Sequence, residues 1–325
     1  GVAGHEILEQ AEEVVDDLDL AAALGPGPDA DGGDGQLAGD GAGQRRGQAF
    51  EDHREGAGLL DGAGVSLVRV LGHRDVYDFD PFLMLDSFDS TDPSDYLAGF
   101  PTHPHRGIET ITYLLSGKIE HEDSLGNKGV IRAGESQWMT AGSGILHQEM
   151  PKASERMLGF QLWLNLPKAE KMAEPAYLSI TKEMIPVVRQ GGAEIRILSG
   201  KFQDTEGVTP RHIPATILDI HATYGEELTL PVKPDETTFV FLIEGDGMIN
   251  GNLIESKTAV LFGVGDAIRV SPTPEKCLRY ICFSAKPLRE PIAWGGPIVM
   301  NTKEQLRKAF ADLDAGTFIA GTSPD

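Results

Sequence analysis

Residues 110–140 read TITYLLSGKIEHEDSLGNKGVIRAGESQWMT, and residues 238–270 read TFVFLIEGDGMINGNLIESKTAVLFGVGDAIRV. Each stretch gives an apolar strand, a glycine (Gly117 or Gly245), a short second strand, a turn that contains Asn and Gly, and further strands. Short apolar runs separated by Gly, Pro, Asn and Asp are typical of antiparallel β-structure. Because the same order of features occurs twice, the sequence predicts two copies of one antiparallel β-sandwich or barrel, in an all-β protein.

The pattern around the repeat sets the expected domain limits. Regular strand alternation begins near Gly64, so we expect a first domain over residues 64–175 and a second over residues 176–320. The segment 302–313 begins with a potential N-capping threonine and carries apolar residues at helical spacing, which predicts a short C-terminal helix.

Residues 1–60 differ from the rest of the chain. They hold 14 acidic residues against 3 arginines, and 13 of the chain's 39 glycines. Residues 6–24 could form a short acidic helix, but the Gly- and Asp-rich remainder cannot bury enough apolar surface to fold. We therefore expect residues 1–60 to be a disordered acidic leader.

Composition excludes several classes of function. A net charge of −22 over 325 residues argues against direct binding to nucleic acid or to an anionic membrane, since both attract clustered Lys and Arg. No apolar run approaches the length of a membrane span, and the N-terminus lacks a signal-peptide pattern. Cys277 and Cys282 are the only cysteines and are poorly spaced for a disulfide bond. These features predict a soluble cytoplasmic protein.

Two pairs of candidate metal ligands lie in the first copy. His103 and His105 are two residues apart in PTHPHRG, and His147 and Glu149 are two residues apart in GILHQEM. Side chains at positions i and i+2 of a strand point to one face, so each pair can converge on a common centre. Three imidazoles and one carboxylate suit Fe(II), Mn(II), Ni(II), Cu(II) or Zn(II) better than Ca²⁺ or Mg²⁺. The second copy has no such pairs, and we expect it to be metal-free.

Five blocks of sequence resemble the pirin family of the cupin superfamily over about residues 64–320. The blocks are FDPFLMLD at 79–86, FPTHPHRG at 100–107, QWMTAG at 137–142, GILHQE at 144–149, and WGGP at 294–297 followed by MNT at 300–302. The resemblance implies a bicupin, in which two jelly-roll barrels stand in tandem. It also implies a single Fe(II) ion in the N-terminal barrel, held by His103, His105, His147 and Glu149.

Spacing alone does not decide which glutamate is the carboxylate ligand. Glu109 follows His105 at the spacing of the general cupin pattern His-x-His-x-x-x-Glu and shares the strand parity of the two histidines. The resemblance to pirins favours Glu149 and leaves Glu109 as a buried or outer acid. His121 could face the barrel interior, but its acidic neighbours suit the barrel rim. We expect Gln137 or Trp138 to contact a ligand.

The surroundings of the four candidate ligands favour an open site over a closed structural one. Structural zinc sites are usually rich in cysteine, and no cysteine is near these residues. Apolar residues from neighbouring strands are expected beside the metal, as in a substrate pocket. These residues are Phe82, Met84, Trp138 and Met139.

Two functions follow from the resemblance. The first is an Fe(II)-dependent dioxygenase that acts on a planar flavonol or polyphenol, as quercetin 2,3-dioxygenases do, with Glu149 as the base that takes the substrate proton. The second is a non-catalytic, metal-dependent regulatory protein that binds a transcription factor or a metabolic enzyme. Because the chain is strongly acidic, such a protein partner would offer a basic face.

Overall fold

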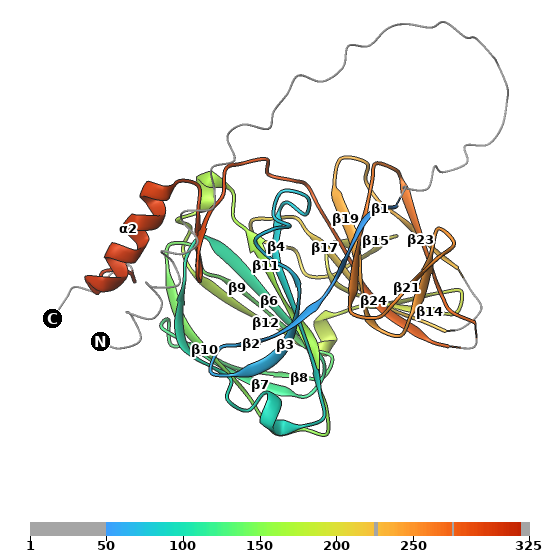
Figure 1. Cartoon of the computed structure of the whole chain (residues 1–325), viewed down its shortest axis with the longest axis horizontal. Helices are drawn as coiled ribbons and strands as arrows, with labels where there is room; N and C mark the ends of the chain where they lie inside the picture. The colour runs from blue at the N-terminus through green and yellow to red at the C-terminus, as the bar shows by residue number, and fades with distance from the viewer. Residues whose placement is uncertain (1–49, 224–226, 275, 320–325) are drawn as a thin grey trace, which may run out of the picture.

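Two β-barrels lie side by side and account for most of the chain (Figure 1). The computed structural model describes residues 50–223, 227–274 and 276–319. Within these residues the only α-helix is α2, at Lys303–Asp314, and three short 3₁₀ helices connect strands at Pro93–Asp95, Lys168–Glu170 and Lys182–Met184. None of the described helices is long and apolar enough to cross a membrane. The all-β prediction with a short C-terminal helix is confirmed.

The first barrel consists of a seven-stranded sheet and a four-stranded sheet. The larger sheet has the order β12-β9-β6-β11-β4-β3-β2, with bounds Ala176–Ile180, Ser136–Thr140, Ile108–Ser116, Met157–Asn165, Phe82–Ser90, Val65–Leu71 and Ala57–Asp61. The smaller sheet has the order β5-β10-β7-β8, with bounds Phe100–His105, Ile145–Pro151, Lys118–Asp123 and Lys128–Arg132. All strand pairs are antiparallel, as the short runs and tight turns of the sequence predicted.

The second barrel repeats this arrangement. Its seven-stranded sheet has the order β1-β22-β19-β24-β17-β14-β13, with bounds Phe50–Glu55, Thr258–Phe262, Thr237–Glu244, Leu278–Ala285, Thr216–Ala222, Ala193–Ser199 and Val187–Gln190. Its four-stranded sheet has the order β18-β23-β20-β21, with bounds Leu228–Pro231, Ala267–Pro272, Gly247–Ile249 and Asn252–Ile254. A two-stranded sheet, β15-β16, lies at Lys201–Phe202 and Thr205–Glu206.

Equal positions in the two sheet orders show which strands correspond. β6 corresponds to β19 and β9 to β22, while β10 of the small sheet corresponds to β23. The repeat in the sequence suggests that residues 136–140 correspond to residues 267–270, but this match is wrong by one strand. The glycine-containing turns Gly134-Glu135 and Gly265-Asp266 look alike, but they precede different strands of the repeat.

Two edge strands connect the barrels. β1 pairs with β22 of the second barrel, although it precedes the first barrel in the sequence. β12 pairs with β9 of the first barrel, although residues 176–180 fall in the expected second domain. Residues 50–60, which were predicted to be disordered, therefore form strands β1 and most of β2. The other part of the predicted leader, including the helix over 6–24, lies outside the described residues.

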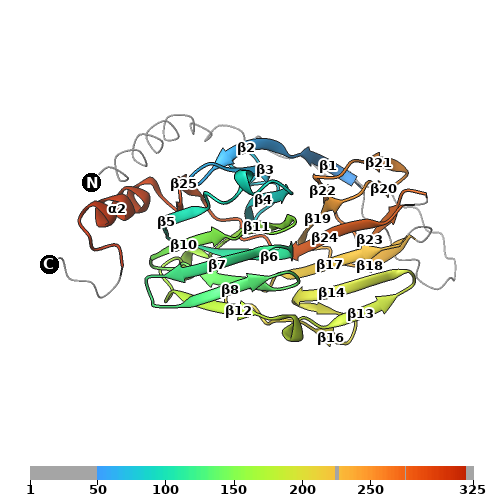
Figure 2. The same cartoon turned by 90° about the horizontal axis from the view of Figure 1, so that it is seen from below.

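The two large sheets face each other across a shared apolar core. Phe82 and Phe160 from the first barrel meet Phe239 and Phe283 from the second, with ring centroids between 5.0 and 6.0 Å apart. Figure 2 shows the two barrels next to each other in a second view. All four rings are fully buried, so the barrels are held together by desolvated aromatic area.

The C-terminal tail returns from the second barrel to the first. It contains the hairpin β25-β26, at Ala293–Gly295 and Ile298–Met300, followed by α2, which lies beside the first barrel in Figure 1. Thr302 caps the helix by accepting from the backbone N–H of Gln305, and Gln305 completes a capping box, as the threonine predicted. Leu306, Ala309 and Phe310 form the buried face of the helix.

Candidate metal centre

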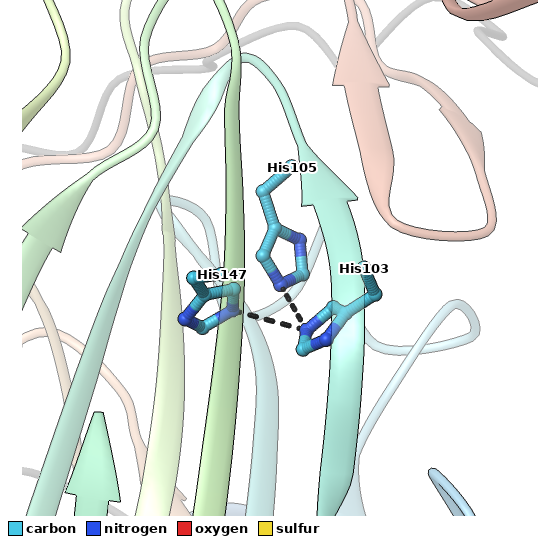
Figure 3. A group of neighbouring side chains, drawn as sticks. All are labelled: His103, His105 and His147. Atoms are coloured by element: carbon cyan, nitrogen blue, oxygen red, sulfur yellow. Dashed lines mark hydrogen bonds between the residues drawn. The ribbon is translucent and has the colours of Figure 1, made fainter. Parts of the chain in front are cut away.

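Three imidazole rings from two strands of the first barrel's small sheet converge on one another (Figure 3). His103 and His105 come from β5, and His147 comes from β10, where it is paired directly with His103. The Nε2 atom of His103 lies 3.0 Å from the Nε2 atoms of both His105 and His147. The alternation of side chains along each strand thus brings together the three histidines that the sequence singled out.

Backbone carbonyl groups hold two of the rings in a defined tautomer. Nδ1 of His103 lies 2.8 Å from the carbonyl oxygen of Pro101, and Nδ1 of His105 lies 3.0 Å from that of Pro297. A carbonyl oxygen only accepts, so each Nδ1 carries the proton and donates it. In the neutral rings the Nε2 atoms of His103 and His105 are therefore lone pairs that face each other.

Burial keeps two of these rings neutral. His105 and His147 are 2% and 1% exposed. Desolvation lowers the pKa of each well below its usual value, and the nearby His103 lowers both further. His103 is half-buried and follows the exposed residues Pro101 and Thr102, so the triad is reached from solvent on the β5 side.

The triad fits a transition-metal ion. Two lone pairs 3.0 Å apart repel each other unless a cation is shared between them. Two nitrogens at about 2.1 Å from one metal ion and at a right angle to each other lie about 3.0 Å apart, which is the spacing of the Nε2 atoms here. Neutral imidazoles with hydrogen-bonded Nδ1 atoms are also the usual form of histidine ligands.

Glu149 lies on the inward face of β10, two residues after His147, and is 2% exposed. Its Oε1 accepts from Gln137 Nε2 at 2.5 Å and from Thr112 Oγ1 at 3.0 Å, and its Oε2 accepts from Gln161 Nε2 at 2.6 Å. Among the described residues no Lys or Arg forms an ion pair with it. The three histidines form a group with ligand atoms within 4.8 Å of one another, and the carboxylate of Glu149 is outside that group.

Glu109 faces the opposite side of the first barrel's large sheet. It shares its face of β6 with Ile111 and Tyr113 of the core between the barrels, whereas Thr112, which contacts Glu149, points inward. Thr140 donates to Glu109 at 2.7 Å, and burial raises the pKa of its carboxyl group. The alternative with Glu109 as ligand is therefore wrong. The chain turns at Gly107, where φ is +80°, so strand parity cannot be counted from His105 to Glu109.

The expected neighbours of the site divide between two faces. Gln137 contacts Glu149, but Trp138 lies with Phe82 in the core between the barrels. Met84 and Met139 belong to the apolar cluster beside the site, together with Trp163 and Trp294. Gln137 therefore contacts a ligand only if Glu149 is one, so that prediction stays a prediction, whereas the placement of Phe82 and Trp138 beside the metal is wrong.

Several residues near the site were not anticipated. Thr112 and Gln161 hold the Glu149 carboxylate, and the Trp163 indole packs edge-on against His105 at 5.0 Å between centroids. Trp294 lies 5.7 Å from Trp163 and is stacked on His73 at 3.8 Å. The rings of His105, Trp163, Trp294 and His73 therefore form a row in which each ring contacts the next. The strand period places Gln161 and Trp163 on one face, but nothing in the sequence shows which face meets Glu149.

The C-terminal tail holds the β5–β6 turn that follows His105. The Pro297 carbonyl contacts His105, and Ile298 of the tail forms an isolated β-bridge with Arg106. The Nζ of Lys171 donates to the carbonyl oxygens of Gly107 and Val299 at 2.8 and 2.9 Å. Lys171 is 2% exposed, and burial lowers its pKa to about 7. Gly107 permits this close contact because a Cβ atom there would overlap the carbonyl oxygen of Val299.

Among the described residues, the other histidines lie apart from the triad, with one exception. His212 bonds to Glu170, and His221 is exposed on β17 of the second barrel. His121 was expected at the rim, but it is 2% exposed, and its ring centroid lies 5.4 Å from that of His147. The two cysteines are both free.

Models of two protein families match the chain. The model described as Pirin matches residues 64–164, and the model described as Pirin C-terminal cupin domain matches residues 217–319. Together these matches span more than half of the chain, and they correspond to the two barrels.

Known proteins of similar sequence and structure agree with this match. A pirin-like protein of Caulobacter vibrioides is 41% identical over 268 residues, which are 81% of this chain and 96% of the relative. Pirin of Homo sapiens is 38% identical over 259 residues, covering 78% and 88% of the two chains. The crystal structure of a quercetin 2,3-dioxygenase from Acinetobacter baumannii superposes with a TM-score of 0.78 at 31% identity, covering 84% of this chain and 99% of the other.

Proposed function

Since the chain belongs to the pirin family of bicupins, we propose that it is a mononuclear Fe(II)-dependent dioxygenase that acts on a flavonol or a related planar polyphenol. The observation that carries the proposal is the set of three imidazole Nε2 atoms at metal-ligand spacing, reached from solvent beside the half-buried His103. The likeness to the quercetin 2,3-dioxygenase structure supports the reaction class. Imidazole ligands alone also suit Mn, Ni, Cu and Zn.

In this proposal His103, His105 and His147 are metal ligands through Nε2, and Glu149 is the fourth ligand. Glu149 is buried beside the triad, and the two glutamines and the threonine that hold it are uncharged. A bound metal cation would therefore balance its charge. When bound, the metal would act as a Lewis acid that lowers the pKa of a substrate hydroxyl group.

The chain's own groups prepare the substrate. Glu149, on leaving the metal, takes the hydroxyl proton on a carboxylate oxygen, and Gln137 and Gln161 hold that carboxylate by hydrogen bonds. Trp163, edge-on to His105, presents an aromatic surface suited to a flat ring system. Apolar residues beside the triad, Met84 among them, keep water away from the activated ring.

The test measures oxygen consumption by iron-loaded protein with quercetin against the same concentration of free Fe(II). We expect turnover well above free iron, and its loss in His103→Ala, His105→Ala and His147→Ala together with most of the bound metal. These variants should keep the β-fold, because apolar clusters hold the barrels. The matched control is His221→Ala, an exposed histidine of the second barrel, which should behave as wild type.

Two results would contradict the proposal. A triad variant that retains stoichiometric metal would remove that histidine from the ligand set. Oxygen consumption no faster than that of free iron would instead support the non-catalytic regulatory role. In that role a protein partner with a basic surface would bind this acidic chain, whose net charge is −22.

A further inference from the structure

His147 differs from the other two histidines of the triad in its second ring nitrogen. The Nδ1 atoms of His103 and His105 each have a backbone carbonyl as acceptor. Nδ1 of His147 is buried and has no hydrogen-bond partner within the described part of the chain. Histidine ligands almost always donate this second N–H to a carboxylate, a carbonyl or water, which fixes the ring and strengthens the ligand.

A group that could serve Nδ1 of His147 comes from β7, at Lys118–Asp123. In the β7–β10 pair, Asp123 is opposite His147, and His121 is opposite Glu149. Opposed residues of an antiparallel pair share a face, so all four side chains point into the barrel. The rings of His121 and His147 are 5.4 Å apart between centroids, with 50° between their planes.

Asp123 sets the tautomer of His121. Its Oδ1 accepts from the backbone N–H groups of Leu125 and Asn127, and its Oδ2 lies 3.1 Å from Nε2 of His121. A carboxylate only accepts, so Nε2 of His121 carries the proton and Nδ1 is left as a lone pair. That Nδ1 is also buried and has no partner among the described residues.

Two complementary buried groups therefore remain on one face: an acceptor on His121 and, once Nε2 of His147 is a ligand, a donor on Nδ1 of His147. A buried water between two such groups replaces the hydrogen bonds that both would otherwise lose. The His121 ring cannot turn freely, because Tyr177 is stacked on it at 4.4 Å and 21°. Tyr177 in turn lies over Gly129, where a Cβ atom would overlap its hydroxyl group.

We propose that His121 is a positioning residue for the metal ligand His147: Asp123 orients His121, and Nδ1 of His121 accepts, through one buried water, the proton on Nδ1 of His147. The inference rests on the metal site proposed above. It assigns to the pair Asp123–His121 the role that the carbonyl groups of Pro101 and Pro297 have for the other two ligands. Without this acceptor, His147 would be a weaker and less well-oriented donor to the metal.

Three substitutions separate this role from a purely structural one. His121→Asn places an amide near the position of Nδ1 and gives up the contact with Asp123. His121→Gln places an amide near the position of Nε2, keeping the contact with Asp123 and leaving nothing at Nδ1. His121→Phe keeps the aromatic ring over Tyr177 and removes both nitrogens. His221→Phe, at an exposed site of the second barrel, is the matched control.

The first measurement is metal affinity of the full chain in competition with a chelator, with Cu(II) and Fe(II) as probes. We expect affinity to fall about 10-fold to 100-fold in His121→Phe and His121→Gln, the usual cost of losing an outer hydrogen bond to a ligand. His121→Asn should stay within a few-fold of wild type. If His121→Gln keeps the affinity and His121→Asn loses it, His121 serves only the turn at Asp123, and the proposal is overturned.

The second measurement can overturn the proposal on the wild-type protein alone, so it does not depend on the folding of any variant. In the Cu(II)-loaded wild type, electron spin-echo modulation reads the quadrupole coupling of each ligand's remote ring nitrogen, which reflects its hydrogen bonding. We expect three hydrogen-bonded remote nitrogens in wild type, and one altered in His121→Phe. A wild-type spectrum with one remote N–H lacking an acceptor overturns the proposal. Wild-type protein that binds the metal with these couplings but does not oxidise quercetin would refute only the proposed dioxygenase activity.

Discussion

Arg106 holds the C-terminal tail against the candidate metal centre, and a single substitution there should detach the tail. It follows His105 directly and is 3% exposed. Its Nε donates to the carbonyl oxygen of Ser143 at 2.7 Å, its Nη1 to Asp312 at 2.8 Å and its Nη2 to the carbonyl oxygen of Phe318 at 2.8 Å. The guanidinium also lies 4.1 Å from the centre of the Phe318 ring.

The change Arg106→Leu removes these contacts while keeping an apolar side chain in the site. Removing one partner of a buried ion pair costs about 3–5 kcal/mol. Asp312 is one-fifth exposed and keeps Lys308 as a partner at 2.9 Å, so the lower end, about 3 kcal/mol, applies to the packing of the tail. The tail also carries the Pro297 carbonyl that orients His105, and losing that contact should weaken metal binding about 10-fold.

Hydrogen exchange of the backbone amides in α2 reports the detachment of the tail, and chelator competition reports metal affinity. We expect faster exchange in α2 and weaker metal binding in Arg106→Leu, with Arg106→Lys in between. Arg307→Leu, which removes an exposed guanidinium from α2 itself, should change neither. Unchanged exchange in α2 together with wild-type affinity in Arg106→Leu would refute the idea that the tail supports His105.

Three further predictions follow from single features of the structure. Glu149→Gln should weaken metal binding and alter the metal's spectrum because a buried anion becomes neutral, whereas Glu109→Gln should leave both unchanged because that carboxyl faces the other barrel. Burial lowers the pKa of Lys171 to about 7 from its ordinary value of 10.5, so the unfolded chain binds more protons between these values, and stability measured by urea unfolding should rise with pH there in wild type but not in Lys171→Met. Deleting residues 1–61 should lower the melting temperature more than deleting residues 1–49, because β1 and β2 are paired edge strands.

Each of these has a clear contrary result. A first coordination shell that changes in Glu109→Gln and survives in Glu149→Gln would restore the general cupin assignment. Equal pH slopes in wild type and Lys171→Met would show that Lys171 keeps an ordinary pKa in the folded protein. Equal melting temperatures for the two truncations would show that β1 and β2 contribute no stability.

The candidate ligands could be predicted from the sequence because His103 and His105 lie within one strand and His147 and Glu149 lie within another. A spacing of two residues is enough to place two side chains on one face, whatever the rest of the fold does. The same rule failed for Glu109, because its count from His105 crosses the turn at Gly107. It also failed to reveal that His121 is buried, since burial depends on Tyr177 and on strands far away in the sequence.

The groups that support the ligands could not be predicted because they are long-range contacts. The partner of His105 is a carbonyl oxygen 192 residues away, and any residue at position 297 would supply one. The pairing of β1 with the second barrel and of β12 with the first could not be predicted for a similar reason. β1 is short and charged, and only its pairing with β22 shows that it belongs to a sheet.

The two barrels share one strand arrangement, but corresponding strands bury different kinds of side chain. Inward-facing residues of β22 and β23 are apolar and fill the second barrel, as Val260, Ile268 and Val270 do. At the corresponding strands β9 and β10, the first barrel buries Gln137, His147 and Glu149, which cost desolvation instead of contributing burial. The first barrel gains its stability from its other apolar clusters, from the aromatic core that it shares with the second barrel, and from the C-terminal tail that packs against it. Metal release should then loosen the site without unfolding the protein, since none of these supports depends on the ion.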